Sequence, residues 1–542
     1  MARTIRLRRW QKAALEAFEA RPGADFLAVA TPGAGKTTFA LAAIRQDLAR
    51  NPERRVVVVA PTQALKQQWA DAAEELDLHL EPGWSSSDGR LPDDLHGVVS
   101  TYQQVAGSAA ALAALARAGF VVLDEVHHAG DERAWGEGVR RAFSGAGVRL
   151  CLSGTPFRSD TRAIPFVEYD ADGLATPDLE YGYGDALADG HVVRPVRFPR
   201  TDGRMEWVGA DGAYATATFQ ERLDRVASGQ RLRTALSVTG EWLPDVLRRA
   251  DARLREVRRG HPGAGGMVIA IDTEHARGVA ALMRRDLGVD PPVVVSEDPA
   301  AATRITAYAR GTEPWIVAVR MISEGVDIPR LRVGVYATTT TTELFFRQAV
   351  GRLVRWTTGL GAQPSHMFIP DDPRLRAHAL RIAEQRRHSL RARRDVEPDE
   401  DGRPDEVPRP PEDQLSLFAA ISAVPVAEGD APAPVDTSVE PQPSSPDDDP
   451  ELVLELAPAP RRAGSGPIDA DAPPPAPPRR RRRELRDTNA GLARQIARIT
   501  GLSHAQVNAE LNRRVGIGRI DEATVDDLER RRDHAARWLA VA

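Results

Sequence analysis

The stretch FLAVATPGAGKTTFALAAI, residues 26–44, predicts a strand, a glycine-rich turn and a helix. Glycines in this turn let backbone N–H groups crowd round phosphate oxygens, where a side chain would intrude. Lys36 supplies a point charge for the β and γ phosphates, and the Thr37 hydroxyl can bind Mg²⁺. Ala30 stands where the GxxxxGK[ST] pattern has its first glycine. We predict a nucleotide site lined by Thr31, Gly33, Ala34, Gly35, Lys36, Thr37 and Thr38.

Short apolar runs recur along the chain after this loop, and segments with helical patterning separate them. Examples are VVVVA at 56–60, FVVLD at 120–124 and, from Met267 onward, MVIAI, WIVAV and VGVYA. Continuous apolar strands that alternate with helices are typical of parallel sheets covered on both faces. We therefore predict an α/β fold with two tandem domains, at about 1–195 and 196–395.

The composition changes sharply after Asp395. Residues 396–478 hold twenty of the forty-one prolines and many acidic residues. Low hydrophobicity, high charge and proline together predict a disordered linker over 396–483. Beyond the run RRRRR at 479–483, Leu492, Ile496 and Ile499 share one helical face, which predicts a small helical module over 484–542.

The overall composition excludes several classes of protein. The 542 residues carry a formal net charge of -5, which indicates no particular partner. Cys151 is the single cysteine, which excludes an internal disulfide framework and favours a reducing cytosol. No uncharged apolar run approaches the length of a membrane span, and no apolar stretch of a secretory signal follows the basic N-terminus. We expect a cytoplasmic protein whose few lysines, Lys12, Lys36 and Lys66, include a functional one.

VVLDEVHH, residues 121–128, ends an apolar strand in two carboxylates and two histidines. Adjacent histidines on a strand end point in opposite directions, which disfavours a zinc site. A strand end that is merely charged at the surface is a further alternative. The pattern favours Asp124 as a Mg²⁺ ligand together with Thr37, and Glu125 as the residue that orients and deprotonates the attacking water.

The order of the motifs resembles that of superfamily 2 helicases and translocases of the DExH type (DEAD/DEAH box), over about residues 5–395. The motifs are LRRWQKAAL (7–15), APTQALKQQW (60–69), VSTYQQV (99–105), SGTP (153–156), SEGVDIPRL (323–331) and QAVGRLVR (348–355). The resemblance implies two RecA-like P-loop domains that hydrolyse ATP with Mg²⁺ in the cleft between them. It implies that Gln11 reads adenine, and that the second domain contributes Gly325, Asp327, Gln348, Arg352 and Arg355. SEGVDIP and YGYGDALADG (181–190) are most similar to the DNA repair and restriction-type branch.

The resemblance also places nucleic acid against Pro61, Thr62 and Thr101. No base-reading motif is present, so we expect backbone contacts that are largely independent of sequence. We predict an ATP-dependent DNA helicase or translocase acting in repair, recombination or defence. The alternatives are a DExH RNA helicase and an ATP-switched nucleic-acid-binding adaptor. No lysine has an acid two residues before it, which excludes a [DE]xK nuclease, and the lack of a CxxC pair excludes zinc fingers.

The predicted linker contains QLSLF at 414–418, which is similar to the short peptide by which bacterial DNA-processing proteins bind the replication sliding clamp. An extended segment of this kind inserts apolar side chains into a cleft. The contacts expected here come from Gln414, Leu415, Leu417 and Phe418. The alternatives are a transient helix and a short return contact onto the second domain. ELVLELA at 451–457 is another apolar island, for which we expect no partner. The run RRRRR at 479–483 fits two interpretations equally, an electrostatic anchor for nucleic acid and a basic run that merely closes the acidic linker.

Overall fold

The computed structural model describes residues 3–391, 419–425, 452–456 and 478–541, except residues 22, 131–132, 155–162, 210–211, 296–297, 299 and 320–327. The chain divides into two compact units. The first contains residues 1–29, 35–180 and 450–542, and the second contains residues 30–34 and 181–449. In this division the first unit includes the C-terminal residues, and the domain boundary near residue 195 stays a prediction.

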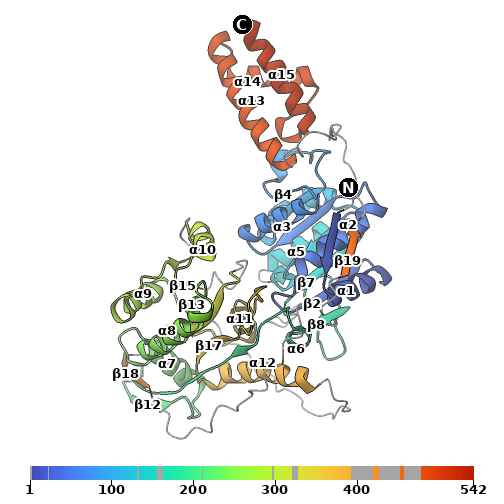
Figure 1. Cartoon of the computed structure of the whole chain (residues 1–542). Helices are drawn as coiled ribbons and strands as arrows, with labels where there is room; N and C mark the ends of the chain where they lie inside the picture. Colours follow the sequence, from blue (N-terminus) through green and yellow to red (C-terminus); the bar gives the residue numbers. More distant parts are fainter. Residues whose placement is uncertain are drawn as a thin grey trace. The chain divides into compact units, whose positions relative to one another are not determined.

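A seven-stranded sheet in the order β4-β5-β3-β6-β7-β2-β8 forms the centre of the first unit (Figure 1). Neighbouring strands from β4 to β2 run parallel. The strands are β2 (Asp25–Ala30), β3 (Val56–Ala60), β4 (Leu80–Glu81), β5 (Gly97–Thr101), β6 (Phe120–Leu123), β7 (Val148–Ser153) and β8 (Leu179–Tyr181). The helices are α1 (Arg9–Ala20), α2 (Lys36–Arg50), α3 (Gln63–Glu75), α4 (Tyr102–Leu115) and α5 (Arg133–Phe143), with the 3₁₀ turns η1 (Ser86–Asp88) and η2 (Val126–Gly130).

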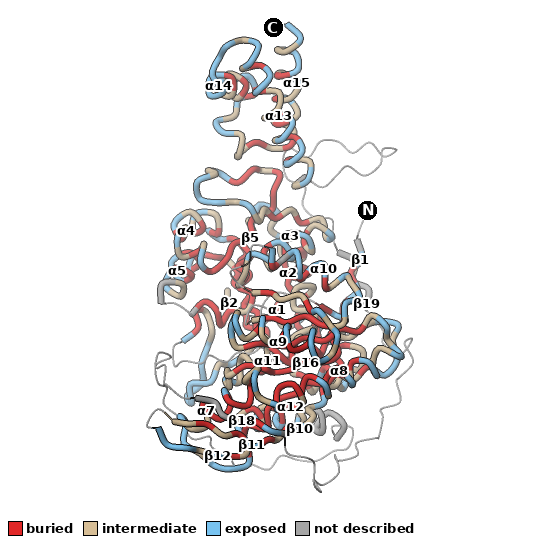
Figure 2. The backbone as a smooth tube through the Cα atoms, turned by 90° about the vertical axis from the view of Figure 1, so that its left-hand side faces the viewer, coloured by how far each residue is buried: buried red, intermediate tan, exposed pale blue. Residues whose placement is uncertain are grey.

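The central strands of this sheet are apolar without interruption because both of their faces are covered. Every residue of β3 and of β6 is buried. Figure 2 colours the buried stretches of the backbone red. Because the strands are parallel, the loops that leave them emerge at one carboxyl edge. The predicted motifs follow β2, β3, β5, β6 and β7, so the fold brings them to that edge.

A second parallel sheet, in the order β10-β17-β16-β13-β15-β14 with β9 beside β17, forms the centre of the second unit. Its strands are β9 (Val196–Arg197), β10 (Arg200–Thr201), β13 (Gly265–Ala270), β14 (Val293–Val294), β15 (Trp315–Val319), β16 (Leu331–Ala337) and β17 (Ser365–Pro370). The helices are α6 (Tyr183–Ala188), α7 (Arg225–Ala235), α8 (Trp242–Gly260), α9 (Thr273–Leu287), α10 (Ala301–Arg310), α11 (Glu343–Gly351) and α12 (Pro373–Arg391). The predicted α/β class with two tandem parallel-sheet domains is confirmed.

The tail supplies a strand to the second unit. β11 (Gly203–Val208) and β12 (Tyr214–Thr218) form a hairpin, and β18 (Ala419–Pro425) pairs antiparallel with the free edge of β11. Ala423 is buried in the same apolar core as Met205 and Trp207. An edge strand exposes unpaired backbone groups that an extended segment can satisfy. The prediction of a disordered linker is therefore wrong for residues 419–425.

The tail supplies another strand to the first unit. β19 (Leu452–Leu456) pairs antiparallel with β1 (Arg3–Leu7), and the two form a separate two-stranded sheet. The apolar island at 451–457 thus has a partner, contrary to our expectation, because its alternating apolar residues suit a strand. The remaining linker, including the QLSLF peptide at 414–418, lies outside the described residues.

Three helices form a C-terminal module: α13 (Pro478–Thr500), α14 (His504–Val515) and α15 (Val525–Val541), with the 3₁₀ turn η4 (Ile520–Glu522) before α15. Its apolar core includes Ile496 and Leu511. The predicted helical module is confirmed, but α13 begins at Pro478, so the arginine run that we placed in the linker is helical. None of the helices in the described part of the chain combines the length and the apolar character that a membrane span requires.

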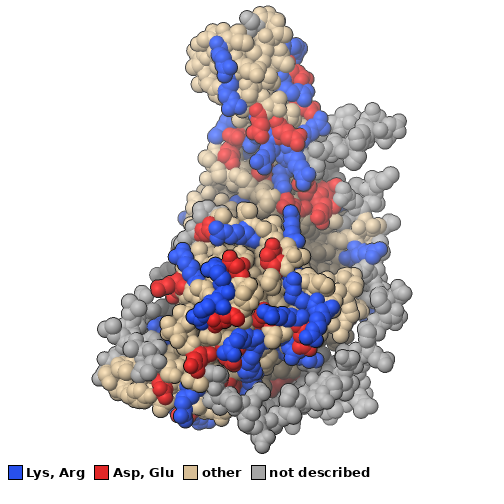
Figure 3. Space-filling model, turned by 60° about the vertical axis from the view of Figure 1, so that its left-hand side comes forward, with Lys and Arg blue, Asp and Glu red and all other residues tan. Residues whose placement is uncertain are grey.

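The arginine run fastens this module to the first parallel sheet. Arg479 lies 2.5 Å from a carboxylate oxygen of Asp71 on α3, and Arg482 lies 3.2 Å from Asp94 in the segment before β5. Arg482 and Asp94 are both 3% exposed, and Asp94 also accepts a hydrogen bond from the backbone of Val525 at 2.9 Å. In Figure 3, basic and acidic side chains lie intermixed below the tip of the module. These contacts give the arginine run a third interpretation, in which it attaches the C-terminal module to the rest of the first unit.

Candidate ATP-binding site

The phosphate loop has the backbone that its glycines allow. Gly33 and Gly35 adopt φ values of +87° and +95°, a left-handed region that disfavours other residues. Gly35 is also the N-cap of α2, so the loop leads directly into the helix that begins with Lys36. A Cβ atom on Gly35 would lie 2.6 Å from the side-chain nitrogen of Gln11, which leaves no space for a larger residue.

Gln11 connects the loop to the start of α1. Its Nε2 donates a hydrogen bond to the Gly35 carbonyl at 2.9 Å, and its Oε1 accepts one from the Arg8 backbone at 2.8 Å. The side chain is 3% exposed. The residue predicted to read adenine is thus fixed beside the phosphate loop by both ends of its amide group.

Lys36 and Glu125 meet across the site. Lys36 Nζ lies 2.8 Å from Glu125 Oε1, and the backbone N–H of Gly154 donates to Glu125 Oε2 at 2.9 Å. Glu125 follows the end of β6 with a φ of +46°, a backbone conformation that costs about 1–3 kcal/mol in a residue other than glycine. Three loops, after β2, β6 and β7, therefore converge on one carboxylate.

Asp124 is held by two aromatic side chains that were not predicted to contact it. The indole Nε1 of Trp69 donates to Asp124 Oδ2 at 2.8 Å, and the Tyr102 hydroxyl donates to the Asp124 carbonyl at 2.8 Å. Both aromatic residues are buried. Trp69 lies in the motif APTQALKQQW and Tyr102 in VSTYQQV. Their positions in these motifs are the sequence feature that could have pointed to a role at the site.

Burial and neighbouring charges give the two carboxylates, Asp124 and Glu125, different pKa values. Burial, together with the neighbouring Glu125 charge, raises the pKa of Asp124 to about 6. Burial acts on Glu125 in the same direction, but Lys36 and His127 outweigh it and hold the pKa of Glu125 at about 2. Because Lys36 bonds to Glu125, Asp124 is the carboxylate whose charge a bound cation would stabilise most.

The two histidines do not lie on a strand end, which was the premise used against a zinc site. They lie on η2, with ring centroids 4.4 Å apart. His127 Nδ1 is 3.2 Å from the Ser153 hydroxyl and 3.7 Å from Glu125 Oε2. Within the described ranges, no group of three or more His, Cys, Asp or Glu side chains could hold a metal ion. His127 therefore acts as a neighbour of the Glu125 carboxylate.

The threonines predicted to contact nucleic acid are helix caps. Thr62 accepts a hydrogen bond from Leu65 N at the start of α3, and Thr101 accepts one from Gln104 N at the start of α4, both at 3.3 Å. Pro61 precedes the first cap. Lys66 is 4% exposed and donates to Gln104 Oε1 at 2.8 Å, and burial lowers its pKa. Lys66, for which we predicted no particular role, thus connects the first turn of α3 to the first turn of α4.

The other predicted residues fall into three groups. Thr31 follows β2, Ala34 donates to the Thr31 carbonyl at 3.1 Å, and Thr37 and Thr38 are in the first turn of α2. In the second unit, Gln348 lies on α11, Arg352 is its C-cap and Arg355 forms a bridge with Val193. The positions outside the described residues are Gly325, Asp327, Gln414, Leu415, Leu417 and Phe418.

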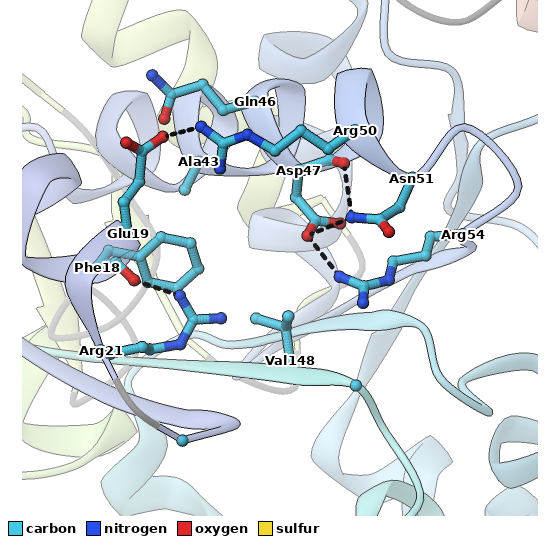
Figure 4. A pocket seen from close by; sticks show the side chains of 12 residues that line it. Phe18, Glu19, Arg21, Ala43, Gln46, Asp47, Arg50, Asn51, Arg54 and Val148 are labelled. Carbon is cyan, nitrogen blue, oxygen red and sulfur yellow. Dashed lines mark hydrogen bonds and ion pairs between the residues drawn. The ribbon is translucent and has the colours of Figure 1, made fainter.

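A polar cavity of about 320 Å³ lies elsewhere in the first unit (Figure 4). It is bordered by the C-terminal ends of α1 and α2 and by Val148, the first residue of β7. Arg50 pairs with Glu19 and Arg54 with Asp47 around it, as the dashed lines in Figure 4 show. The cavity is therefore at the amino edge of the sheet, opposite the edge that carries Lys36.

Residues 4–158 match the family model described as the type III restriction enzyme, res subunit. The matched range contains Gln11, Lys36, Asp124 and Glu125. The match supports the predicted resemblance to superfamily 2 helicases over this part of the chain.

The chain also has curated relatives. It is 46% identical over 390 residues to "Uncharacterized protein Rv2917" of Mycobacterium tuberculosis, a match that covers 71% of this chain and 64% of the relative. It is 45% identical over 390 residues to "Uncharacterized protein ML1624" of Mycobacterium leprae, covering 71% and 65%. The chain thus spans slightly less than two thirds of the length of these relatives.

Similar solved structures include a putative HsdR subunit of a type I restriction enzyme from Vibrio vulnificus, with 16% identity, a TM-score of 0.47, and coverage of 68% of this chain and 65% of that one. The type ISP restriction-modification enzyme LlaBIII bound to DNA has 16% identity and a TM-score of 0.47, covering 70% and 30%. Mss116p bound to single-stranded RNA and AMP-PNP has 12% identity and a TM-score of 0.45, covering 67% and 69%.

Proposed function

We propose that the chain is a nucleic-acid-stimulated ATPase that translocates along DNA or unwinds it. The observation that carries this proposal is the bond between Lys36 and Glu125 at 2.8 Å, beside Asp124 and at the mouth of the phosphate loop. A lysine, a carboxylate for a metal and a carboxylate for water are the parts that phosphoryl transfer requires. The family match over residues 4–158 supports the same activity.

ATP binding would change the partners of Lys36. The ammonium group of Lys36 bonds to Glu125, and the β and γ phosphates would compete for that group. Loss of the lysine raises the pKa of Glu125 above its value of about 2, since Lys36 is the largest influence that lowers it. Glu125 would then orient and deprotonate the attacking water, while Gly154 N–H keeps its other oxygen in place.

Thr37 and Asp124 are the residues that would hold Mg²⁺. A hydroxyl and a carboxylate oxygen are ligands that Mg²⁺ prefers. Burial and the neighbouring Glu125 charge raise the pKa of Asp124, and a bound cation would oppose both effects. The ion would neutralise charge that develops on the transferred phosphoryl group. Trp69 would orient Asp124 by holding its other oxygen.

The second unit would complete the reaction. Arginines that arrive from another domain make hydrolysis depend on closure, because they stabilise transition-state charge only when the domains meet. Arg352 and Arg355 suit this role, together with Gln348 and the predicted Gly325 and Asp327. Alternating closure and release would move a strand past Pro61, Thr62 and Thr101 through backbone contacts.

DNA is the proposed substrate in preference to RNA. The matched family is a restriction-enzyme subunit, and restriction enzymes act on DNA. The test measures ATP hydrolysis by the full-length chain with single-stranded DNA, duplex DNA, forked DNA and RNA. Stimulation by DNA, with strand displacement or translocation that needs ATP, would support the proposal. Stimulation by RNA alone would favour the RNA helicase alternative.

Lys36→Ala tests the role of ATP. Loss of the phosphate-binding charge should reduce hydrolysis by about 10²–10³-fold. Lys12→Ala is the matched control, because Lys12 is 52% exposed and pairs with Glu16 on the surface of α1. If Lys36→Ala abolished hydrolysis and left cellular function intact, the chain would act as an ATP-switched adaptor and not as a motor.

We also propose that QLSLF binds a bacterial sliding clamp. The proposal rests on the resemblance of QLSLF to clamp-binding peptides and on its apolar side chains, which suit an apolar cleft. Leu417→Ala combined with Phe418→Ala should abolish capture of the clamp by the full-length chain. Substitution of Leu380, which is 53% exposed on α12, by Ala is the control. Unchanged capture by the double variant would contradict the proposal.

A further inference from the structure

Gln11 lies only four residues beyond the strand that pairs with the tail. β1 ends at Leu7, Arg8 caps α1, and Gln11 occupies the first turn of that helix. The Arg8 backbone donates to the Gln11 side chain at 2.8 Å. A displacement of β1 would therefore be transmitted to the Gln11 amide through one residue.

The partner of β1 comes from the far end of the chain. Ile5 lies opposite Leu454, and all five residues of β1 are in register with β19. Among the described strands, β19 alone pairs with β1. A single strand leaves its backbone groups without partners, so β1 depends on β19 for its ladder.

The paired strands also rest on the helix of the phosphate loop. Both β1 and β19 contact α2. Leu7 is 2% exposed, and the ring of Trp10 packs 6.0 Å from that of Phe39 on α2. The strand pair, the start of α1 and the start of α2 thus form one packed assembly around Gln11.

We propose that the tail strand β19 positions Gln11 for adenine and thereby sets the preference of the site for ATP over other nucleotides. This inference rests on the proposed function, because it assumes that Gln11 reads the base. An amide group can pair with the donor and acceptor of adenine at once, whereas guanine offers a different pattern. Such recognition depends on position, and an error of about 1 Å can cost about 100-fold in rate. Leu452–Leu456 are positioning residues, because they act through β1.

The test replaces residues 452–456 of the full-length chain with alternating glycine and serine. We expect the KM for ATP to rise about tenfold and kcat to change less than about twofold, because Lys36 and Glu125 keep their contacts. The ratio of kcat/KM for ATP to that for GTP should fall about tenfold. A merely structural role would not change this ratio selectively.

The matched control makes the same replacement in the other tail strand, at residues 419–425. β18 pairs with β11 in the second unit, so the ATP-to-GTP ratio should remain that of the wild type. Gln11→Ala supplies a further comparison. The strand replacement should add no further loss of base preference in the Gln11→Ala background, because both changes remove the same contact.

A reversible crosslink between β1 and β19 is a control for simple unfolding. Ile5→Cys and Leu454→Cys place two thiols at paired positions, where antiparallel neighbours are within disulfide distance. Cys151 is buried and leaves the engineered pair to react. The oxidised protein should keep the wild-type nucleotide preference.

The outcomes separate this inference from the proposed function. A wild-type chain that hydrolyses no nucleotide contradicts the proposed function. A wild-type chain that prefers ATP, with a strand variant that keeps the same preference, contradicts the role of β19 alone. Failure of the two cysteines to crosslink, or a wild-type chain that treats ATP and GTP alike, would overturn it as well.

Discussion

Trp69 Nε1 lies 2.8 Å from Asp124 Oδ2, and this hydrogen bond joins α3 to the carboxyl end of β6. α3 begins at a helix cap made by Thr62, in the motif expected to face nucleic acid. One indole group therefore connects that motif to the carboxylate proposed to bind Mg²⁺. A strand of nucleic acid that shifted α3 would act directly on the orientation of Asp124.

The Trp69→Phe variant tests this connection. Loss of a hydrogen bond to a charged group typically costs about 1.5–3 kcal/mol, and outer partners of metal ligands change metal affinity by about 10–100-fold. We expect ATP hydrolysis to need at least tenfold more Mg²⁺ and to recover at high Mg²⁺. Titration of the steady-state rate with Mg²⁺ measures the effect.

Trp84→Phe is the matched control for that experiment. Among the described residues, the indole nitrogen of Trp84 has no hydrogen-bond partner, and its ring packs against the apolar core that contains Tyr102. Its substitution removes an N–H group without breaking a bond. An equal Mg²⁺ shift in both variants would contradict a specific role for Trp69.

Glu125→Gln separates binding from hydrolysis. Glutamine keeps the size of the side chain but releases Lys36 from a charged partner, so ATP should bind several-fold more tightly. Hydrolysis should fall by about 10²–10⁴-fold, because the general base is lost. Equilibrium binding of ATP and single-turnover hydrolysis measure the two effects separately. Weaker ATP binding would show that the Lys36–Glu125 bond does not compete with phosphate.

Arg482→Ala should loosen the C-terminal module. Removal of one partner from a buried ion pair typically costs about 3–5 kcal/mol, because the other charge stays buried. Asp94, whose pKa burial raises, would be left with the Val525 backbone as its main partner. Hydrogen exchange in α13 and α15 should increase, while exchange in β3 and β6 stays slow.

Arg480→Ala is the control from the same run. Its ion pair with Glu74 spans 3.8 Å, and the side chain is 71% exposed, so the pair should contribute less than about 1 kcal/mol. Replacing Arg482 with Met and Asp94 with Leu together should restore much of the loss, since neither charge is then left buried. Equal loosening by Arg480→Ala would argue against Arg482 as the anchor.

His366 predicts how acid affects the second unit. Burial, followed by the charges of Arg253, Arg197 and Arg332, lowers its pKa from 6.5 to about 3. Below pH 6.5 the unfolded chain gains a proton that the folded chain does not, so the free energy of unfolding falls as the pH drops towards 3. At pH 5 the difference of 1.5 pH units corresponds to about 2 kcal/mol. His366→Asn should remove this share of the acid sensitivity, measured by denaturation at pH 7.5 and pH 5.

Much of the ATP site followed from the sequence because its residues are local. The strand, the glycines and Lys36 are contiguous, and parallel topology alone brings Glu125 to the same edge. Trp69 and Tyr102 escaped prediction because their roles depend on helix packing. The left-handed backbone of Glu125 and the 3₁₀ turn that carries His127 were also not predicted. Nothing in VVLDEVHH indicates that the strand ends at Leu123.

The two tail strands could not be predicted for a different reason. Their apolar residues were visible, but a proline-rich and acidic surrounding predicts disorder. β18 forms because the edge of β11 accepts it, and β19 forms by pairing with the single strand β1. Ile5 and Leu454 have no local signal in common, and pairing over such a distance is specified by the folded edge alone. The same holds for Arg482, whose role depends on Asp94.

The attachment of the C-terminal module through Arg482 and Asp94 has a mechanical consequence. The module and Lys36 belong to the same compact unit, and the Arg482–Asp94 pair is a buried link between them. A ligand bound by the module would therefore be carried on the unit that contains Lys36.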